Sequence, residues 1–194
     1  MTEGPLSAAL LLQAYASGVF PMADSKEDAS VFWVEPENRG ILPLDAFHVP
    51  HSLRRVLRKG TFEVSFDRDF RAVIEGCADR PETWINGQIL DACMRLHEMG
   101  FAHSVECYRN GRLAGGLYGI SLRAAFFGES MFSRETNASK VALCALVEHL
   151  NRQGFMLLDT QFITSHLSRF GAVEIPQKEY LKLLKNALYT KALF

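Results

Sequence analysis

Residues 104–117 read Ser-Val-Glu-Cys-Tyr-Arg-Asn-Gly-Arg-Leu-Ala-Gly-Gly-Leu, and this stretch decides the fold of the 194-residue chain. Asn110-Gly111 is the dipeptide most typical of a two-residue turn between antiparallel strands. We therefore predict a hairpin of strands 104–108 and 112–117. A third apolar run at 122–127 predicts the next strand of the same sheet.

Regular elements continue on both sides of this hairpin. Upstream, residues 61–66 alternate as a strand, and two runs of apolar residues at helical spacing follow, at 70–77 and 89–99. Downstream, we predict a helix that Asn137 or Ser139 caps and Gly154 closes. A strand at 155–158, a short helix to Phe170 and an amphipathic helix at 178–188 complete the chain. The order β-α-α-β-β-β-α-β-α predicts an α+β fold with a mixed sheet of the acetyltransferase (GNAT) type, whose central strands splay to admit an acyl donor.

The first 60 residues are less regular. A helix at 6–17 is followed by short strands and loops at 20–50, and a short helix at 52–59 ends at Gly60. We predict a small N-terminal lobe with a basic helix at 1–60 and the acyltransferase-like domain at 61–194.

The composition indicates a globular protein, because 48% of the residues are hydrophobic and 22% are charged. Lys plus Arg number 21 against 22 for Asp plus Glu, which excludes a strongly basic, histone-like nucleic-acid binder but not a local basic patch. The four cysteines form no Cys-x-x-Cys pair, and no apolar run is long enough to cross a bilayer. We expect no membrane association and a soluble protein of a reducing compartment, the cytoplasm.

A basic cluster occupies the short helix before Gly60, and it consists of Arg54, Arg55, Arg58 and Lys59. The three arginines share one helical face through i,i+3 and i,i+4 spacing. Such a patch can neutralise the phosphates of a nucleic acid, whatever the net charge. The alternative is an ordinary solvated helix face.

Two acidic segments are candidates for chemistry. Asp159 and Gln161 follow an apolar strand, and in an extended segment they point to the same side, so that one can orient the other. The alternative for Asp159 is a cap for the helix that begins near Thr164. Glu129 lies in an apolar run between Gly128 and Ser130, where it can hold a polar ligand group. Its alternative is a turn acid with local hydrogen bonds.

A set of bulky apolar residues from predicted strands and one helix face forms either core or a ligand pocket. Its members are Leu117, Phe126, Met131, Leu143, Leu146 and Leu158. Trp33 and Trp84 lie in loop-like contexts, where an aromatic ring stacks on a base or anchors a lid.

Two common site types find no support in the sequence. His48 and His51 have metal-like spacing but no further ligands nearby, so we predict no metal site. Residues 112–117 are the nearest match to a phosphate-binding turn for coenzyme A. Leu117 stands there where a small residue is needed, so we expect no such cofactor.

Many segments, in order along the chain, give it a resemblance to the leucyl/phenylalanyl-tRNA–protein transferases. They are Gly18-Val-Phe-Pro21, Phe32-Trp-Val-Glu-Pro36, Arg39-Gly-Ile-Leu42, Ser52-Leu-Arg-Arg55, Thr83-Trp-Ile85, His103-Ser-Val-Glu106, Gly115-Gly-Leu-Tyr-Gly119, Gly128-Glu-Ser-Met-Phe-Ser133, Ala138-Ser-Lys140 and Asp159-Thr-Gln161.

The resemblance implies transfer of Leu or Phe, and also Met, from aminoacyl-tRNA to the N-terminal Arg or Lys of an acceptor protein. This step of the bacterial N-end rule uses no ATP, metal or cofactor, and a monomer is expected. Asp159 and Gln161 match the family's catalytic pair, and Glu129 and Trp84 match contacts with the terminal adenosine. The apolar set matches the aminoacyl pocket, and the basic cluster matches a strip along the tRNA acceptor stem.

The sequence departs from the family at four places, of which one, Thr160 where Cys is common, is expected to have no effect. Met22 stands where the family has a Trp that stacks on the terminal adenine, and a Leu-Ala-Leu-Gly-Gly block and a C-terminal Phe-Trp-x-Pro segment are absent. Two other hypotheses stay open: an acyltransferase with a different donor, and an RNA-binding module without turnover. The proton acceptor also stays open, between an Asp159–Gln161 relay and the tRNA 2′-hydroxyl.

Overall fold

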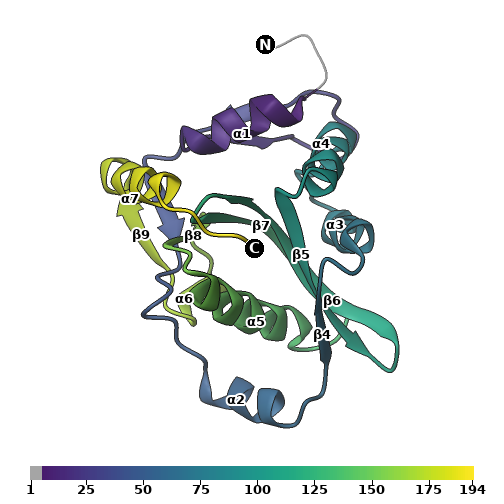
Figure 1. Cartoon of the computed structure of the whole chain (residues 1–194). Helices are drawn as coiled ribbons and strands as arrows, with labels where there is room; N and C mark the ends of the chain where they lie inside the picture. The colour runs from purple at the N-terminus through teal and green to yellow at the C-terminus, as the bar shows by residue number, and fades with distance from the viewer. Residues whose placement is uncertain (1–5) are drawn as a thin grey trace.

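The chain folds around a seven-stranded sheet, as Figure 1 shows for a computed structural model that describes residues 6–194. Along this sheet the strands run in the order β4 (Glu63–Phe66), β5 (Ala102–Arg109), β6 (Arg112–Leu122), β7 (Ala125–Ser133), β8 (Leu157–Gln161), β3 (Asn38–Ile41) and β9 (Val173–Pro176). A separate two-stranded sheet pairs β1 (Phe20–Met22) with β2 (Phe32–Val34).

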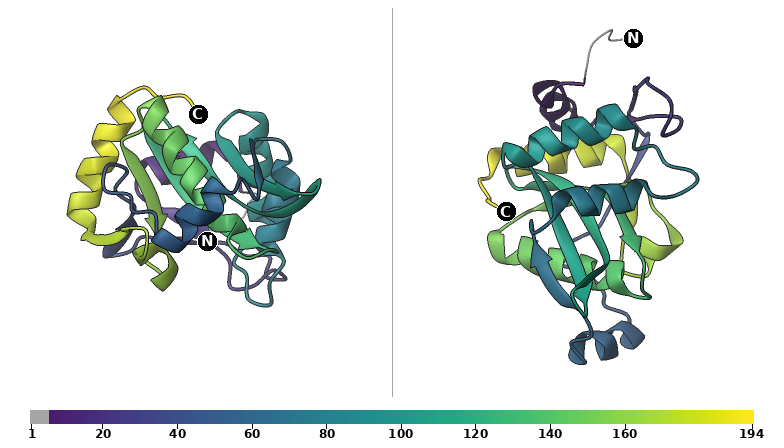
Figure 2. Two further views of the ribbon diagram at one scale, coloured as in Figure 1. Left: turned by 90° about the horizontal axis from the view of Figure 1, so that it is seen from below. Right: turned by 90° about the vertical axis from the view of Figure 1, so that its right-hand side faces the viewer.

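Helices cover both faces of the sheet, as the two views of Figure 2 show. They are α1 (Ala8–Ala16), α2 (His51–Arg58), α3 (Phe70–Ala78), α4 (Gly87–Glu98), α5 (Ala138–Gln153), α6 (Ser165–Ser168) and α7 (Gln177–Tyr189). One core cluster, with Tyr118 and Phe127, joins the sheet to α1, α3, α4 and α7. The other, with Leu117 and Phe126, joins it to α2, α5 and α6. Neighbouring residues of a strand thus belong to opposite cores, as a period of two requires.

The predicted hairpin of β5 and β6 is confirmed. Its two turn residues, Asn110 and Gly111, have φ angles of +50° and +72°, the left-handed conformation that this turn type needs at both positions. The prediction of a third strand at 122–127 is wrong in its bounds. The chain turns at Arg123, whose φ is +59°, and β7 runs on to Ser133. The turn holds a single charged residue and no Gly, Pro, Asn or Asp, so the usual turn signals are missing.

β7 and β8 are neighbours in parallel, and their pairing is short. Residues 125–127 of β7 pair with residues 157–159 of β8, and the described chain shows no pairing between these strands beyond that point. The pairs β4–β5, β5–β6 and β6–β7 are antiparallel. This order confirms the predicted mixed sheet of the acetyltransferase type, and the central strands separate as expected.

β3 and β9 extend the sheet beyond β8. β9 was not predicted, because Val-Glu-Ile-Pro is too short a stretch for its alternation to stand out. Gly40 of β3 crosses under residue 162 so closely that a Cβ atom would lie 2.7 Å from the Phe162 carbonyl carbon. A domain boundary at residue 60 stays a prediction; β3, from the first part of the chain, lies in one sheet with β8 and β9 from the second.

Local signals account for several helix ends. Ser7 caps α1 through its hydroxyl, and Gly154 closes α5 with a φ of +77°, as predicted. Asn137 is the N-cap residue of α5, but its side chain makes no capping hydrogen bond. Instead the Ser133 hydroxyl accepts the Ser139 N–H at 2.9 Å. Every helix in residues 6–194 is too short or too polar to cross a bilayer.

Candidate active site

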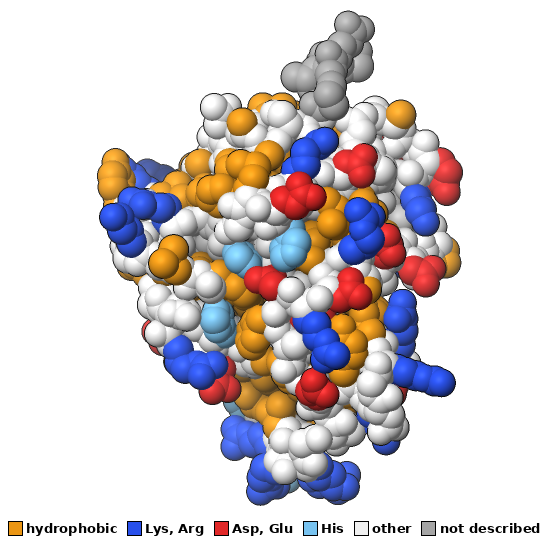
Figure 3. All heavy atoms as spheres, turned by 45° about the vertical axis from the view of Figure 1, so that its right-hand side comes forward, with side chains coloured by type: hydrophobic (Ala, Val, Ile, Leu, Met, Phe, Trp, Pro, Cys, Tyr) orange, Lys and Arg blue, Asp and Glu red, His pale blue; other side chains and the backbone are white. Residues whose placement is uncertain are grey.

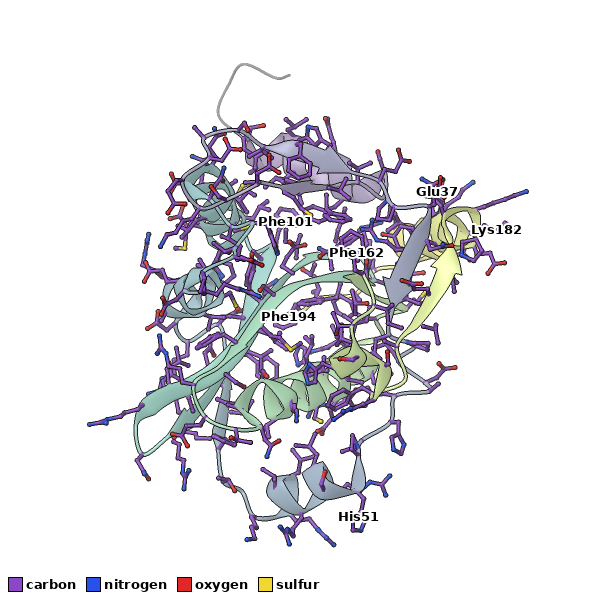
Figure 4. All side chains as sticks on the ribbon, turned by 180° about the vertical axis from the view of Figure 1, so that it is seen from behind. Glu37, His51, Phe101, Phe162, Lys182 and Phe194 are labelled. Atoms are coloured by element: carbon purple, nitrogen blue, oxygen red, sulfur yellow. The ribbon has the colours of Figure 1, made fainter. Side chains whose placement is uncertain are left out.

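A cavity of about 420 Å³ opens where β7 and β8 separate. Its apolar wall includes five residues predicted for the aminoacyl pocket: Leu117, Met131, Leu143, Leu146 and Leu158. The sixth, Phe126, does not line the cavity. Its side chain is fully buried in the core behind it, stacked on Phe194 at 5.4 Å between ring centroids. Figure 4 labels Phe194 between the sheet and α5.

A β-bulge in β7 decides which side chains reach the cavity. The pairing with β6 skips Glu129, which is therefore an extra residue on β7. Phe126 and Met131 are five residues apart and would face opposite sides of a regular strand. The extra residue puts both on the α5 side. The Glu129 side chain reaches the opposite core, where it meets Tyr15 of α1.

Glu129 is a buried acid that has only neutral hydrogen-bond donors. Its Oε1 accepts from the Tyr15 hydroxyl at 2.9 Å and from the Gln161 Nε2 at 2.7 Å. Burial raises the pKa of Glu129 to about 8; the nearby charge of Asp159 adds to the rise and the bond from Tyr15 opposes it. The interpretation as a turn acid with local bonds is wrong, because these partners lie 114 and 32 residues away in the sequence.

Asp159 is a fully buried acid with a cationic partner. Arg39 of β3 donates from Nε to Oδ1 at 3.0 Å and from Nη2 to Oδ2 at 2.8 Å. The Tyr180 hydroxyl donates to Oδ2 at 2.6 Å. Arg39 is itself 1% exposed, and its Nη1 donates to the Gly18 carbonyl at 2.9 Å. The pair is therefore sealed from solvent with its hydrogen-bonding groups satisfied, the condition under which a buried ion pair is tolerated.

Gln161 links the two acids. Its main-chain N–H donates to Asp159 Oδ1 at 2.7 Å, while its side chain donates to Glu129. The expected extended geometry is wrong at this residue, because Gln161 has a φ of +62°. Asp159 therefore holds Gln161 through the main chain and does not line the cavity, whereas Gln161 does. Asp159 is also not a helix cap: the Thr164 hydroxyl caps α6 by accepting the Leu167 N–H at 3.2 Å.

The connection between α3 and α4 supplies the rim of the cavity. Arg80 and Trp84 both line it, and the Trp84 ring is half-buried. Trp33 lies in β2 and is absent from this lining. Met22 lies in β1, half-buried against the core cluster that Trp84 also borders. Figure 4 labels Phe162, which follows β8, lines the cavity and meets the Phe20 ring edge-on at 5.7 Å.

The basic cluster lies apart from this cavity, on α2. Arg54, Arg55, Arg58 and Lys59 are all exposed, and Leu53 anchors the helix in the core. Arg55 and Lys59 line a second cavity of about 490 Å³ together with two further arginines, Arg109 and Arg134. Figure 3 shows Lys and Arg side chains gathered at this end of the molecule, and His51 in Figure 4 marks the start of α2.

Residues 112–117 do not form a phosphate-binding turn. They lie within β6, where β5 pairs on one side and β7 on the other. At Gly115 an added Cβ atom would lie 2.7 Å from both the Ala138 side chain and the Phe132 carbonyl oxygen. The glycine serves close packing of strand on helix and leaves no approach for a pyrophosphate.

Among the site residues that were missed at the sequence level, three contact the two buried acids. Arg39, Tyr15 and Tyr180 come from β3, α1 and α7, far apart in the chain. Arg39 was named only as part of a motif. The one signal that could have marked it is a lone charge before Gly40-Ile-Leu42, in a segment whose neighbours are buried.

Two family descriptions together match nearly the whole chain. Residues 41–185 match "Leucyl/phenylalanyl-tRNA protein transferase", and residues 4–37 match the N-terminal domain of the same family. The chain belongs to this family. A member from Paramagnetospirillum magneticum is 58% identical over 98% of this chain and 93% of its own length. A second member, from Ruegeria sp. strain TM1040, is 56% identical over 94% of this chain and 87% of its own.

One solved structure resembles this chain in fold alone. The C-terminal domain of a protein assigned as a lysylphosphatidylglycerol synthetase from Agrobacterium fabrum superposes with a TM-score of 0.50. The identity is 11%, and the match covers 89% of this chain and 64% of that chain.

Proposed function

We propose that this chain transfers Leu or Phe, and also Met, from charged tRNA to the N-terminal Arg or Lys of an acceptor protein, which marks the acceptor for degradation. The observation that carries this proposal is the cavity at the separation of β7 and β8 in a chain of this family. One wall is apolar, and the other presents Glu129 and Gln161. We also propose a monomer in the cytoplasm, where charged tRNA is available.

The apolar wall suits an unbranched or γ-branched side chain. Leu117 and Met131 approach from the sheet and Leu143 and Leu146 from α5, three residues apart on one helical face. A pocket of fixed shape rejects a β-branched Ile or Val by crowding near Cα. Such discrimination is worth about 1–3 kcal/mol.

The reaction converts an ester to an amide and needs no external energy source. The neutral α-amine of the acceptor attacks the ester carbonyl carbon, and a C–N bond forms. The bond from that carbon to the adenosine 3′-oxygen then breaks, and one amine proton ends on the leaving oxygen. The protein has to position the amine and stabilise the tetrahedral oxyanion.

Gln161 is the residue that we assign to the amine. Its Nε2 is engaged by Glu129, so that Oε1 is the side that accepts a hydrogen bond from the attacking amine. An amide oxygen is too weak a base to retain the proton. Asp159 is fully buried behind Arg39 and Tyr180, so it does not meet the amine. We therefore assign the proton transfer to the 2′-hydroxyl beside the leaving oxygen and the orientation of the amine to Gln161.

The tRNA body is assigned to the exposed cluster of α2. Four positive residues without an acid among them suit the phosphates of an acceptor stem, which a protein contacts through the backbone and not through the bases. Changing Arg55 and Arg58 together to Gln is expected to raise the KM for charged tRNA about 10-fold and to flatten its dependence on salt. A KM that keeps its full salt dependence would contradict this assignment.

A transfer assay tests the proposal directly. Leucyl-tRNA and a peptide that begins with Arg should give a peptide extended by one Leu. Gln161→Ala keeps the main-chain bond to Asp159 and should lower kcat about 100-fold or more. Gln153→Ala, on the exposed end of α5, is the matched control. Absence of transfer, or equal rates for both variants, would contradict the proposal.

Binding measurements and a modified donor separate the other hypotheses. Tight binding of acetyl-CoA would favour an acyltransferase with a different donor, against the strand geometry of residues 112–117. Salt-dependent tRNA binding without any product would favour an RNA-binding module. Finally, a donor that ends in 2′-deoxyadenosine should react far more slowly, and an unchanged rate would rule out assistance by the 2′-hydroxyl.

A further inference from the structure

The main cavity has one guanidinium in its lining, that of Arg80. It is the only Arg or Lys among the described residues that form this lining. The ion pairs of residues 6–194 do not include it, although Glu82 lies two residues away. The other basic group of the lining is His166, and burial lowers the pKa of that imidazole, which favours its neutral form. Within residues 6–194, Arg80 is therefore the one Arg or Lys whose charge faces the cavity.

Two hydrogen bonds hold this guanidinium in place. Its Nε donates to the Cys77 carbonyl at 2.8 Å, at the end of α3, where a cation is favoured by the helix dipole. Its Nη2 donates to the Ser130 hydroxyl, next to Glu129 on the bulge of β7. Its Nη1 has no partner within the described chain. An exposed Arg normally keeps much of its rotational freedom, so fixing it at two points orients its remaining donors.

The chemistry of the remaining donors favours a phosphate. A planar guanidinium forms paired hydrogen bonds with a phosphate or a carboxylate. The donor substrate of the proposed function, on which this inference rests, offers one such group nearby. With the aminoacyl group in the apolar part of the cavity, the terminal adenosine lies at the rim with Trp84. The first negative charge of the donor is then the phosphodiester on the 5′-oxygen of that adenosine.

We infer that Arg80 binds this phosphate, and that it is a positioning residue for the donor ester. Because Ser130 ties the guanidinium to the strand that carries Glu129, the contact fixes the distance between the terminal phosphate and the reacting ester. Arg80 thus adds a second phosphate contact, inside the active site, to the one assigned to α2.

Two small donors separate this role from a purely structural one. One is the 3′-leucyl ester of adenosine, which has no phosphate, and the other is the same ester of adenosine 5′-monophosphate. With Arg80→Gln we expect kcat/KM to fall about 10- to 100-fold for the phosphorylated donor, the range for a lost charge-assisted bond. With the unphosphorylated donor it should stay within about 2-fold of the unchanged protein. Ser130→Ala should give a smaller loss with the same dependence on phosphate.

Controls make every outcome decisive. Arg71→Gln removes an exposed arginine of α3 that pairs with Glu75 at 3.5 Å, and it should leave both donors unaffected. Activity with the unphosphorylated donor shows that Arg80→Gln is folded. An equal loss with both donors, or no loss with either, would overturn the inference while leaving the proposed function intact. Failure of the unchanged protein with both small donors and with charged tRNA would instead overturn the proposed function.

Discussion

Two buried acids on neighbouring strands both bind Gln161, yet their surroundings are opposite. Asp159 in the middle of β8 accepts from the Arg39 guanidinium, the Tyr180 hydroxyl and a main-chain N–H. Within residues 6–194, Glu129 on the bulge of β7 accepts only from the Tyr15 hydroxyl and the Gln161 amide. The first acid is neutralised by a paired charge, and the second has a pKa raised to about 8 by burial.

The difference shows how one residue is fixed at both ends. A fully paired carboxylate is a permanent anchor, because separating it from Arg39 would leave a charge in the core. It holds the main chain of Gln161 in a left-handed conformation, which on its own is costly for a residue other than glycine. An acid without a cation exchanges its proton near neutral pH and holds only the side chain. The site thus has a paired half, Asp159 with Arg39, which is rigid, and an adjustable half, Glu129, whose charge changes with pH.

The largest effect is expected from breaking the paired half. Asp159→Asn keeps the shape but leaves the Arg39 charge uncompensated and fully buried. We expect a loss of about 3–5 kcal/mol in the free energy of unfolding, measured by urea titration, together with loss of transfer activity. A loss below about 1 kcal/mol would show that solvent reaches this pair.

A double variant separates stability from chemistry at the same site. Changing Asp159 to Leu and Arg39 to Met removes both charges and should recover much of the stability. It should not recover transfer activity, because the anchor of the Gln161 main chain is gone. Recovery of activity would mean that the carboxylate has only a structural role.

A smaller effect, of at most a few kcal/mol, is expected from the adjustable half, and it depends on pH. In the folded protein Glu129 keeps its proton up to about pH 8, against an ordinary pKa of 4.5. Between these values the folded chain holds a proton that the unfolded chain has released, so stability falls as pH rises through this window and levels off above it. Below the ordinary pKa the penalty is absent.

Glu129→Gln should remove this dependence. Urea unfolding at pH 5, 7 and 9 should show a flatter profile for the variant than for the unchanged protein. The difference between the two should grow with pH in the direction that favours the variant. Parallel profiles would show that Glu129 is ionised throughout, against the effect of its burial.

The parts of the fold that follow from local chemistry could be predicted from the sequence. Asn110-Gly111 determines its turn whatever surrounds it, and Gly154 does the same for the end of α5. The order of elements then led to the separated central strands. The pattern of bulky apolar residues left core and pocket open, and the structure places five of these six residues in the lining of the cavity. The bulge at Glu129 could not be foreseen, because it is a mismatch between two strands and not a property of either one.

The polar half of the site depended on contacts across the chain. Asp159 and Gln161 were recognisable from their motif, but the partners of Asp159 lie 120 and 21 residues away, in Arg39 and Tyr180. No periodicity links such positions, and Tyr180 reads as one more apolar residue of an amphipathic helix. The left-handed backbone of Gln161 was also hidden, because Gln is not among the residues that favour it.

The smallest effects are expected from removing one tyrosine hydroxyl from each acid. Tyr180 donates to Asp159 and Tyr15 donates to Glu129. Tyr180→Phe removes one donor to a charged carboxylate and should lower the free energy of unfolding by about 1.5–3 kcal/mol at pH 7. Tyr15→Phe removes one donor to a mostly protonated acid and should lower it by about 0.5–1.5 kcal/mol. The bond from Tyr15 lowers the pKa of Glu129, so its cost should rise towards that of Tyr180 as Glu129 ionises above pH 8. Urea unfolding of both variants at pH 7 and pH 9 measures this convergence. A constant gap between them would mean that the charge of Glu129 does not change between pH 7 and pH 9, against the raised pKa of this buried acid.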